Sequence, residues 1–292
     1  MKLSIIIVNY NNPHLIEKCL ESILTSSISF PYEIIVVDNA SIDKFKGQGI
    51  KESKNKDNKL TSFQVINNKE NVGFGMANNQ GVKQAKGEFL LFLNTDTEVM
   101  DDAIDKLVKF SEDKTKSIVG AKLFNIDGTS QPSCGPFYTI PVTFTMLFLK
   151  GDQLHITRQS PNKIQEVDWV SGACLLIRKM DFEKLGGFDE TIFMYMDEID
   201  LCYRAKEQNM RVLFYPEAQF IHHGAAGSAD KRDPVYNIYK GLMYFYKKHG
   251  NYVQYTVARI MLWVKAYMGI VVGRSIGNKS LVSAYQKAIS YL

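Results

Sequence analysis

Five short apolar runs alternate with helical patterns through the first 124 residues. The runs are Leu3–Val8, Glu33–Val37, Phe63–Ile66, Glu88–Leu93 and Ile118–Leu123. Helical spacing of apolar residues marks the segments between them, which are Leu15–Leu24, Gly75–Lys86 and Met100–Asp113. Strands that alternate with helices are typical of a parallel sheet covered on both faces. We therefore predict an α/β fold with a doubly wound, mostly parallel central sheet flanked by helices.

The pattern changes after residue 124. Turn-forming residues crowd the stretch from Asp127 to Pro141. We expect a strand over Trp169–Ile177, a helix leading on to Gln208, and a strand over Arg211–Phe214 that ends before Pro216. The charge-rich stretch Lys44–Lys59 is expected to be a solvated loop.

Length and composition allow one large domain with an appendage. The chain has 292 residues, and 45% of them are hydrophobic. Its four cysteines are widely spaced and form no CxxC pair, which favours a reducing cytosol over a disulfide framework or a zinc site. The apolar run at the N-terminus is too short for a signal peptide and lacks a small-residue cleavage site.

Charge divides the chain into an acidic body and a basic tail. Residues 235–292 contain eight Lys or Arg and no Asp or Glu, so residues 1–234 carry a net charge of −4 against +8 for the tail. Nine of the fifteen tyrosines also lie in the tail, together with Trp263. Aromatic residues mixed with basic ones favour the interface of a membrane. We predict a catalytic domain over residues 1–234 and a helical membrane-associating tail over residues 235–292.

One helix of the tail is expected to carry an apolar face. That face consists of Val253, Val257, Ile260, Met261, Val264, Met268 and Val271. Arg259 and Lys265 interrupt it, which favours a helix lying in the membrane interface over one that spans the bilayer. The alternative is an ordinary amphipathic helix packed on the acidic body. Nucleic-acid binding by the tail is not expected, because its aromatic residues suit lipid better.

Polar residues follow three of the predicted strands. The segments are Asn9-Tyr10-Asn11, Asp38-Asn39-Ala40-Ser41 and Asn94-Thr95-Asp96. The carboxyl ends of parallel strands meet at one edge of a sheet, where α/β proteins bind ligands. An Asp at such an edge suits a hard divalent cation and phosphates, and Asp38 could accept hydrogen bonds from a base or ribose. Each segment alone could also be a turn or a helix cap.

Two further stretches carry candidate chemistry. Asn71-Val72-Gly73-Phe74-Gly75 opens a helix, and glycines there let a ligand approach the backbone, although the spacing fits neither GxGxxG nor a P-loop. Asp197, Glu198 and Asp200 are crowded, which raises the pKa of carboxyl groups and suits a general base. The alternative is that these acidic residues only stabilise the N-terminus of a helix through its dipole. His222 and His223 are candidate metal ligands or an incidental pair.

Taken together, these segments give the chain a family resemblance. It resembles the family 2 glycosyltransferases of the GT-A fold, especially the bacterial rhamnosyltransferase-like branch. The matching stretches, in the order of that family, are Ser4–Asn11, Val36–Ser41, Asn71–Gly81, Leu91–Asp96, Val170–Ala173, Gly186–Glu190 and Met194–Leu201.

The resemblance implies a role for each matching residue. The donor nucleotide would contact Asn9, Tyr10, Asp38, Asn39, Ser41, Asn71, Gly73, Asn94 and Thr95. Asp96 matches the last Asp of the family's DxD motif, which binds Mg²⁺ or Mn²⁺, and His222 (or else His223) would be a second ligand. Trp169, Gly172, Ala173 and Asp200 would contact the acceptor or the transferred sugar. Asp197 and Glu198 match the acidic pair that supplies the base, but in inverted order, so the base is open between them.

The function implied is inverting transfer of a sugar from a nucleotide-diphospho donor, best matched by dTDP-L-rhamnose. The acceptor would be a hydroxyl of a bacterial surface glycan or a polyprenyl-linked glycan. The enzyme would be cytoplasmic and peripheral at the inner face of the cell membrane, and a homodimer is compatible with the sequence. Two other classes remain: a sugar-nucleotide nucleotidyltransferase, although Asn9–Pro13 offers no basic phosphate loop, and a non-catalytic membrane-bound glycan-binding module.

Overall fold

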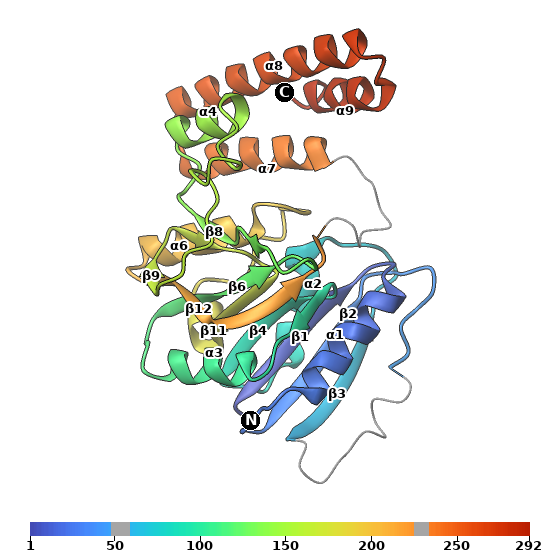
Figure 1. Cartoon of the computed structure of the whole chain (residues 1–292), viewed down its shortest axis with the longest axis vertical. Helices are drawn as coiled ribbons and strands as arrows, with labels where there is room; N and C mark the ends of the chain where they lie inside the picture. Colours follow the sequence, from blue (N-terminus) through green and yellow to red (C-terminus); the bar gives the residue numbers. More distant parts are fainter. Residues whose placement is uncertain (48–58, 225–233) are drawn as a thin grey trace.

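The computed structural model of this chain describes residues 1–47, 59–224 and 234–292 (Figure 1). Most of the expected loop Lys44–Lys59 lies outside these residues. Four strands form the parallel half of the main sheet: β1 (Leu3–Asn9), β2 (Tyr32–Asp38), β3 (Leu60–Asn67) and β4 (Phe89–Asn94). They lie in the order β3-β2-β1-β4, and each neighbouring pair is parallel. The predicted α/β fold with a mostly parallel sheet is confirmed.

The second half of the sheet is mixed. β11 (Cys174–Arg178) runs antiparallel between β4 and β6 (Ser117–Phe124), and β12 (Arg211–His222) runs parallel to β6. β5 (Thr97–Val99) closes the sheet as an antiparallel partner of β12. The short strands β7 (Ser130–Gln131) and β9 (Gln165–Glu166) pair with β6 and β12, and β8 (Cys134–Gly135) pairs with β10 (Trp169–Val170) in a small separate sheet.

Two predicted strands differ from those observed. The strand expected over Trp169–Ile177 is split into β10 and β11, because Ser171-Gly172-Ala173 forms a turn between them. The strand expected to end before Pro216 continues to His222, with a shift of register between Tyr215 and Gln219. Proline is tolerated in a strand at such an irregularity, where its missing N–H is not needed by a neighbour.

Alternating side chains of the strands bury two apolar cores. Ile5 and Ile7 face α1 (Pro13–Thr25) and α3 (Ala103–Glu112), whereas Ile6 faces the opposite layer. That layer contains α2 (Phe74–Gln84), α5 (Lys179–Lys184) and α6 (Asp197–Glu207). All four cysteines are buried as free thiols. The sheet is therefore covered on both faces, and its carboxyl edge is left for binding.

The tail forms a layer of helices beside the α2 and α6 side of the sheet. It consists of α7 (Pro234–His249), α8 (Tyr252–Ser275) and α9 (Lys279–Ile289), and α4 (Ile140–Phe148) from the body joins it. Figure 1 shows α7 next to the body and α8 at the far end of the molecule. The buried stripe of α8 is Ala258, Leu262, Ala266, Ile270 and Gly273, which packs on the other helices of this layer.

This packing leaves the predicted apolar face of α8 largely exposed. Ile260 is 58% exposed, and Val253, Val264, Met268 and Val271 are also exposed. Small residues pack inward instead, because Ala and Gly let neighbouring helices approach closely. The alternative in which this face packs on the acidic body is wrong for the described residues.

Candidate functional site

The ends of the strands bring the predicted polar segments together. In the sheet register Asn9 lies opposite Asp38, and Val8 lies opposite Asn94. β12 ends at the same edge, and its His222 lies opposite Thr97 of β5. Because Asp96 directly precedes Thr97, this pairing brings Asp96 and His222 together from positions 126 residues apart in the chain.

Asn9, Asp38 and Ser41 form a buried support beneath this edge. Asn9 Nδ2 donates to Asp38 Oδ2 at 2.9 Å and to Ser41 Oγ at 3.2 Å, and the backbone N–H of Ser41 donates to Asp38 Oδ1 at 2.9 Å. All three side chains are buried. Direct contact of Asp38 with a nucleotide, as the resemblance implies, would require the segment after Ser41 to shift.

We call the hollow above this support the strand-edge cavity. Of the predicted nucleotide contacts, those that line it are Tyr10, Asn39, Asn71, Gly73, Asn94 and Thr95, together with the predicted metal ligand Asp96. Seven further lining residues received no individual role from the sequence: Val8, Asn12, Phe74, Phe193, Met194, Tyr195 and Asn237. Asn237 comes from α7, so the tail contributes to this wall. Nothing in the sequence around Asn237 distinguishes it from an ordinary helical residue.

Hydrogen bonds between amides fix the wall of the strand-edge cavity. Asn39 Nδ2 donates to Asn71 Oδ1 at 2.8 Å, and the backbone N–H of Val72 donates to Asn39 Oδ1 at 3.1 Å. Gly73 has a φ of +92°, and a Cβ at this position would lie 2.4 Å from the carbonyl oxygen of Phe193. Only glycine suits this position, because it allows both the backbone conformation and the close approach.

Asp96 and His222 form the candidate metal-binding pair. Asp96 Oδ1 lies 3.3 Å from His222 Nε2, and the amide nitrogen of Asn94 lies 3.4 Å from the same ring atom. Carboxylate oxygen and imidazole nitrogen are common ligands of Mn²⁺ and related cations. Within the described ranges, no group of three or more His, Cys, Asp or Glu residues could hold a metal. A cation bound by this pair would therefore need further oxygen ligands from a substrate.

Gln131 sets the orientation of the His222 ring. The amide nitrogen of Gln131 donates to Asn125 Oδ1 at 2.8 Å and to the carbonyl oxygen of His222 at 3.1 Å. Gln131 Oε1 therefore accepts from His222 Nδ1 at 2.6 Å. With its proton on Nδ1, a neutral His222 presents the lone pair of Nε2 to Asp96. Two acceptors facing one another favour a cation between them, so these residues fit a divalent metal.

His223 is held away from this pair. Its Nε2 lies 2.6 Å from Glu98 Oε1, and its backbone N–H donates to the carbonyl oxygen of Asp96. The geometry therefore favours His222 over His223 as the candidate ligand.

A second hollow, the carboxylate cavity, adjoins the first. The predicted residues Trp169, Gly172, Ala173, Asp197, Glu198 and His222 line it, and Arg158, Pro132 and Ser171 complete it. Phe74, Asn94, Met194 and Tyr195 belong to both cavities. A substrate in the strand-edge cavity would thus meet a second substrate in the carboxylate cavity at this shared wall.

Glu198 is the partly exposed carboxylate of the carboxylate cavity. Burial among protein atoms raises the pKa of Glu198, while backbone N–H groups and the nearby charge of Arg158 oppose that shift. A carboxylate with a raised pKa is a stronger base near neutral pH than an ordinary glutamate. Because Glu198 follows the first residue of α6, the N-terminus of that helix also lies beside it.

Asp197 borders the same cavity but is almost fully buried. Burial raises its pKa well above the ordinary value, and the neighbouring charge of Glu198 adds to the shift. The backbone N–H of Gly75, in the first turn of α2, is near this carboxylate and opposes the shift. Asp197 Oδ1 has no hydrogen-bond partner among the described residues. Of the acidic pair, Glu198 is the more accessible to a substrate.

Asp200, predicted to contact the acceptor or sugar, lies outside both cavities. Its carboxylate accepts from Arg204 Nε at 2.8 Å, Lys248 Nζ at 2.7 Å and His249 Nε2 at 2.7 Å. Lys248 and His249 belong to α7, so Asp200 anchors the tail to α6. Asp200 lines neither cavity, because its carboxylate is engaged by these three basic side chains, and its predicted contact with the acceptor or sugar has no support among the described residues.

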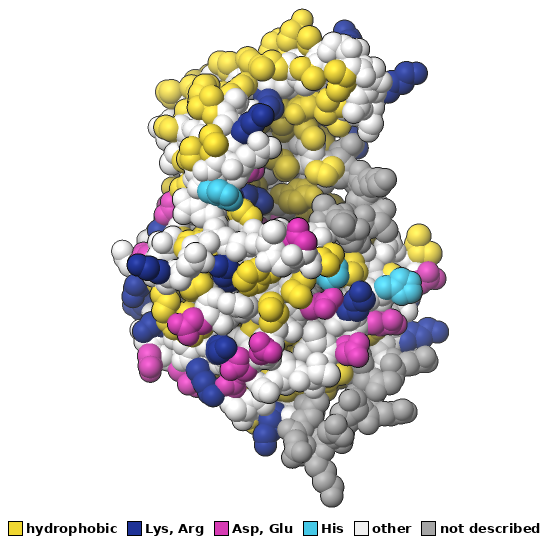
Figure 2. Space-filling model, in the orientation of Figure 1, with side chains coloured by type: hydrophobic (Ala, Val, Ile, Leu, Met, Phe, Trp, Pro, Cys, Tyr) yellow, Lys and Arg dark blue, Asp and Glu magenta, His cyan; other side chains and the backbone are white. Residues whose placement is uncertain are grey.

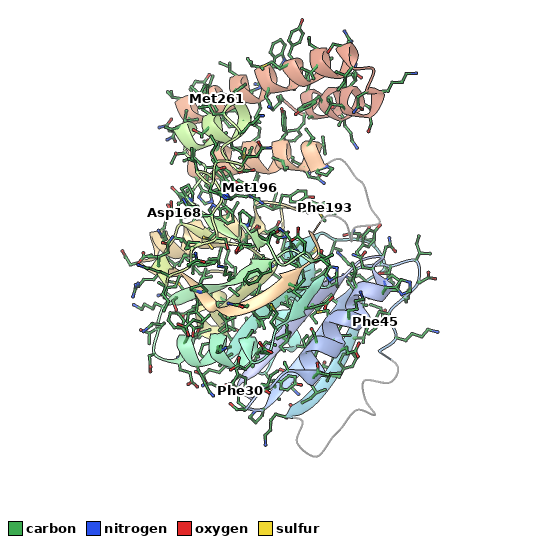
Figure 3. The ribbon with its side chains drawn as sticks, in the orientation of Figure 1. Phe30, Phe45, Asp168, Phe193, Met196 and Met261 are labelled. Atoms are coloured by element: carbon green, nitrogen blue, oxygen red, sulfur yellow. The ribbon has the colours of Figure 1, made fainter. Side chains whose placement is uncertain are left out.

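The loop before Asp197 is strained and is supported by α7. Tyr195 has a φ of 63° and Met196 a φ of 78°, which are uncommon values for residues other than glycine. A Cβ at Gly241 of α7 would lie 2.7 Å from Met196 Cγ and 3.0 Å from the carbonyl oxygen of Tyr195. Figure 3 shows Phe193 and Met196 between the sheet and α7. Strain of this kind persists where surrounding packing enforces it, and it is frequent at active sites.

Comparison with known families agrees with this geometry. The family model for glycosyl transferase family 2 matches residues 4–199. The chain belongs to this family. The matched region includes Asp96, Asp197 and Glu198, whereas His222 and the tail helices lie beyond it.

Relatives of this family 2 glycosyltransferase act in glycan synthesis. One is the low-salt glycan biosynthesis hexosyltransferase Agl10 of Haloferax volcanii, 28% identical over 72% of this chain and 63% of its own length. A second is the N-acetylglucosaminyl-diphospho-decaprenol L-rhamnosyltransferase of Mycobacterium tuberculosis, 26% identical over 80% of this chain and 79% of its own. The rhamnosyltransferase WbbL of Escherichia coli is 29% identical over 52% of this chain and 61% of its own. The predicted likeness to rhamnosyltransferases is confirmed.

Solved structures share the fold. GalNAc-T7 with UDP, GalNAc and Mn²⁺ superposes with a TM-score of 0.57 and 17% identity, over 76% of this chain and 44% of that one. TarS 1-349 of S. aureus with UDP-GlcNAc gives a TM-score of 0.55 and 15% identity, over 100% and 91%. The predicted GT-A fold is confirmed.

Proposed function

We propose that this chain is a metal-dependent, inverting glycosyltransferase that transfers L-rhamnose from dTDP-L-rhamnose to a hydroxyl of a lipid-linked or surface glycan. The observation that carries the proposal is the Asp96 and His222 pair, which lies at the junction of two cavities. One cavity is lined by amides that suit a nucleotide, and the other contains an accessible carboxylate, Glu198.

Asp96 and His222 would hold Mg²⁺ or Mn²⁺, with donor phosphate oxygens as the remaining ligands. Such a cation neutralises the charge that develops on a departing nucleoside diphosphate. Two solved structures of the same fold support this proposal, since GalNAc-T7 was crystallised with UDP and Mn²⁺ and TarS with UDP-GlcNAc. Asp96 is the only carboxylate in the Asn94-Thr95-Asp96 segment, so we expect weak metal binding without the donor.

Glu198 would act as the general base. In the proposed step its carboxylate takes the proton of the acceptor hydroxyl, and the hydroxyl oxygen forms a bond to the anomeric carbon. The bond from that carbon to the phosphate oxygen breaks, and the nucleoside diphosphate leaves from the opposite side. A single displacement of this kind inverts the anomeric centre and needs no enzyme nucleophile.

The names of the relatives support the choice of sugar and acceptor. Two of them are rhamnosyltransferases, and the mycobacterial one acts on a sugar attached to diphospho-decaprenol. We therefore expect a 6-deoxyhexose donor and an acceptor whose first sugar is linked through a diphosphate to a lipid.

Screening sugar nucleotides for release of the nucleoside diphosphate tests the proposal. We expect dTDP release from dTDP-L-rhamnose in the presence of Mn²⁺, with loss of that release in EDTA. Release of inorganic diphosphate from a nucleoside triphosphate and a sugar phosphate would point to a nucleotidyltransferase instead. No release from any donor would favour a non-catalytic glycan-binding protein.

We also propose that the outer face of α8 rests on the cytoplasmic surface of the cell membrane. Figure 2 shows hydrophobic side chains gathered over the end of the molecule formed by α4 and α8. The exposed members on α8 are Tyr252, Val253, Ile260, Trp263, Val264, Tyr267, Met268, Val271 and Val272. By length and composition α8 could also cross a membrane, but about a third of it is buried against protein. The absence of acidic residues from the tail favours an anionic lipid surface.

Binding to lipid vesicles tests this surface. Replacing Trp263 and Val264 together by Ser should weaken binding to phosphatidylglycerol vesicles about tenfold or more, because both side chains are exposed on α8. Ile126→Ser is the matched control, since Ile126 is 66% exposed on the body. Unchanged vesicle binding would contradict this surface, and loss of a dimer in the double variant would show that a second copy of the chain covers this face instead. Deleting the tail is a poorer test, because it would remove the α7 partners of Asp200.

A further inference from the structure

Arg158 is a charged residue of the carboxylate cavity that the proposed chemistry does not use. It lines this cavity with Glu198, Trp169 and His222. Its side chain is exposed to solvent. Among the residues that the structure describes, it is also the only Lys or Arg that lines either cavity.

Aromatic side chains hold this guanidinium in place. It lies 5.4 Å from the centre of the Trp169 ring, and the Tyr138 hydroxyl is close enough to influence its pKa. Trp169 is itself fixed by a hydrogen bond from Nε1 to the carbonyl oxygen of Pro136 at 2.8 Å. Tyr138 stacks on Trp169 with an angle of 18° between the rings. An arginine held over an aromatic face loses little freedom when it binds a ligand.

The guanidinium has donor capacity to spare. Asp152 and Glu198 are close enough to influence it electrostatically, yet neither forms an ion pair with it among the described residues. Arginine carries five N–H donors in a planar fork, and the fork matches the oxygens of a phosphate group. A cation at this position would also offset the repulsion between the Glu198 carboxylate and an anionic acceptor.

We infer that Arg158 binds a phosphate group of the acceptor. This inference rests on the proposed function, in which the carboxylate cavity receives the acceptor. Two relatives are named for acceptors that contain phosphate. One acceptor is a diphospho-decaprenol-linked sugar, and the other is poly(ribitol-phosphate). With its hydroxyl at Glu198, a diphosphate-linked sugar would have its phosphate on the Trp169 side of the cavity, where Arg158 lies. Arg158 would then select phosphate-bearing acceptors over neutral sugars.

Binding of citronellyl diphosphate, which carries a diphosphate on a lipid chain but no sugar, tests the inference. Titrations are made with the full chain in EDTA and without donor, so metal binding at Asp96 does not contribute. We expect Arg158→Met to weaken binding about tenfold or more, and Arg158→Lys to weaken it less, because a single ammonium lacks the fork geometry. Lys163→Met is the matched control: it removes one charge from an exposed residue of the same loop outside both cavities.

Wild-type binding by Arg158→Met, or no saturable binding to the native chain, would overturn the inference. A second readout separates substrate binding from an effect on the base. If Arg158 only tuned Glu198, its substitution would change turnover of phosphate-bearing and neutral acceptors alike, whereas phosphate binding raises KM for the first class alone. If the chain hydrolyses the sugar-nucleotide donor but does not bind citronellyl diphosphate, the proposed function stands and the phosphate site is rejected.

Discussion

The two cavities differ in the polar groups that they contain, which are mainly amides in the strand-edge cavity and an acidic pair in the carboxylate cavity. In the strand-edge cavity, Asn39 and Asn71 hydrogen-bond to one another and to backbone groups, and Asn9, Asp38 and Ser41 form a bonded support beneath them. In the carboxylate cavity, burial raises the pKa of both Asp197 and Glu198. A preformed wall suits binding, whereas carboxyl groups with raised pKa values suit proton transfer. Substitutions on the two sides should therefore have different kinetic signatures.

The largest effect is expected on the carboxylate side. Glu198→Gln keeps the size of the side chain but removes the base, so kcat should fall about 10³-fold. The affinity for dTDP with Mn²⁺ should change less than twofold, because Glu198 does not line the strand-edge cavity. Steady-state turnover assays measure kcat, and isothermal titration calorimetry measures the affinity for dTDP. Retention of near wild-type turnover would exclude Glu198 as the base.

On the strand-edge side, Asp96→Asn should act mainly through binding. Loss of the only carboxylate of the pair should weaken Mn²⁺-dependent binding of dTDP by about 10–100-fold, a magnitude typical of altered metal sites. Binding of dTDP in EDTA should be little changed. Equal affinity of the variant and the native chain in Mn²⁺ would remove Asp96 from the metal site.

The pH dependence of the reaction should show the raised pKa of Glu198. A base must be deprotonated, so kcat/KM falls when the pH is lowered through the pKa of the free enzyme. Burial raises that pKa above the ordinary value, and the acid limb should therefore lie at higher pH than an ordinary glutamate gives. A rate profile with no acid limb above the ordinary glutamate range would contradict the assignment.

Asp197→Asn should have the smallest effect on the reaction, less than about tenfold on kcat, because Asp197 is nearly inaccessible to substrate. Its effect on stability should have the opposite sign to most core substitutions. A raised pKa means that the folded chain binds the proton more tightly than the unfolded chain, so the ionised form costs stability as the pH rises. Removing that charge should leave the free energy of unfolding at pH 7 unchanged or about 1 kcal/mol higher. Thermal or urea unfolding measures this, and a kcat loss as large as that of Glu198→Gln would reverse the roles of the two acids.

The sequence predicted the strand-edge side better than the carboxylate side for a physical reason. Residues at the ends of β1, β2 and β4 reach one edge because parallel strands share a direction, and this follows from the order of the strands. Arg158, Gln131 and Asn237 reach the site through a loop, a short strand and the tail, and no local pattern predicts that packing. Asp200 shows the converse, because proximity in sequence to Glu198 suggested a substrate contact, whereas its salt bridges join α6 to α7.

Part of the tail contributes to the site, although the sequence predicts a separate unit. The sequence predicts a separate domain after residue 234, and we retain the membrane role of α8 as a proposal. α7, however, supplies Asn237 to the strand-edge cavity and packs Gly241 against the strained Tyr195–Met196 loop. Residues 235–249 are therefore part of the framework of the site.

Pulsed electron paramagnetic resonance of Mn²⁺ bound with dTDP tests the central claim most directly. If Asp96 and His222 hold the cation, the spectrum of the native chain should contain nitrogen coupling from one imidazole. That coupling should vanish in His222→Asn and persist in His223→Asn, because His223 is engaged by Glu98. Absence of nitrogen coupling in the native chain, or its loss only in the His223 variant, would contradict the account.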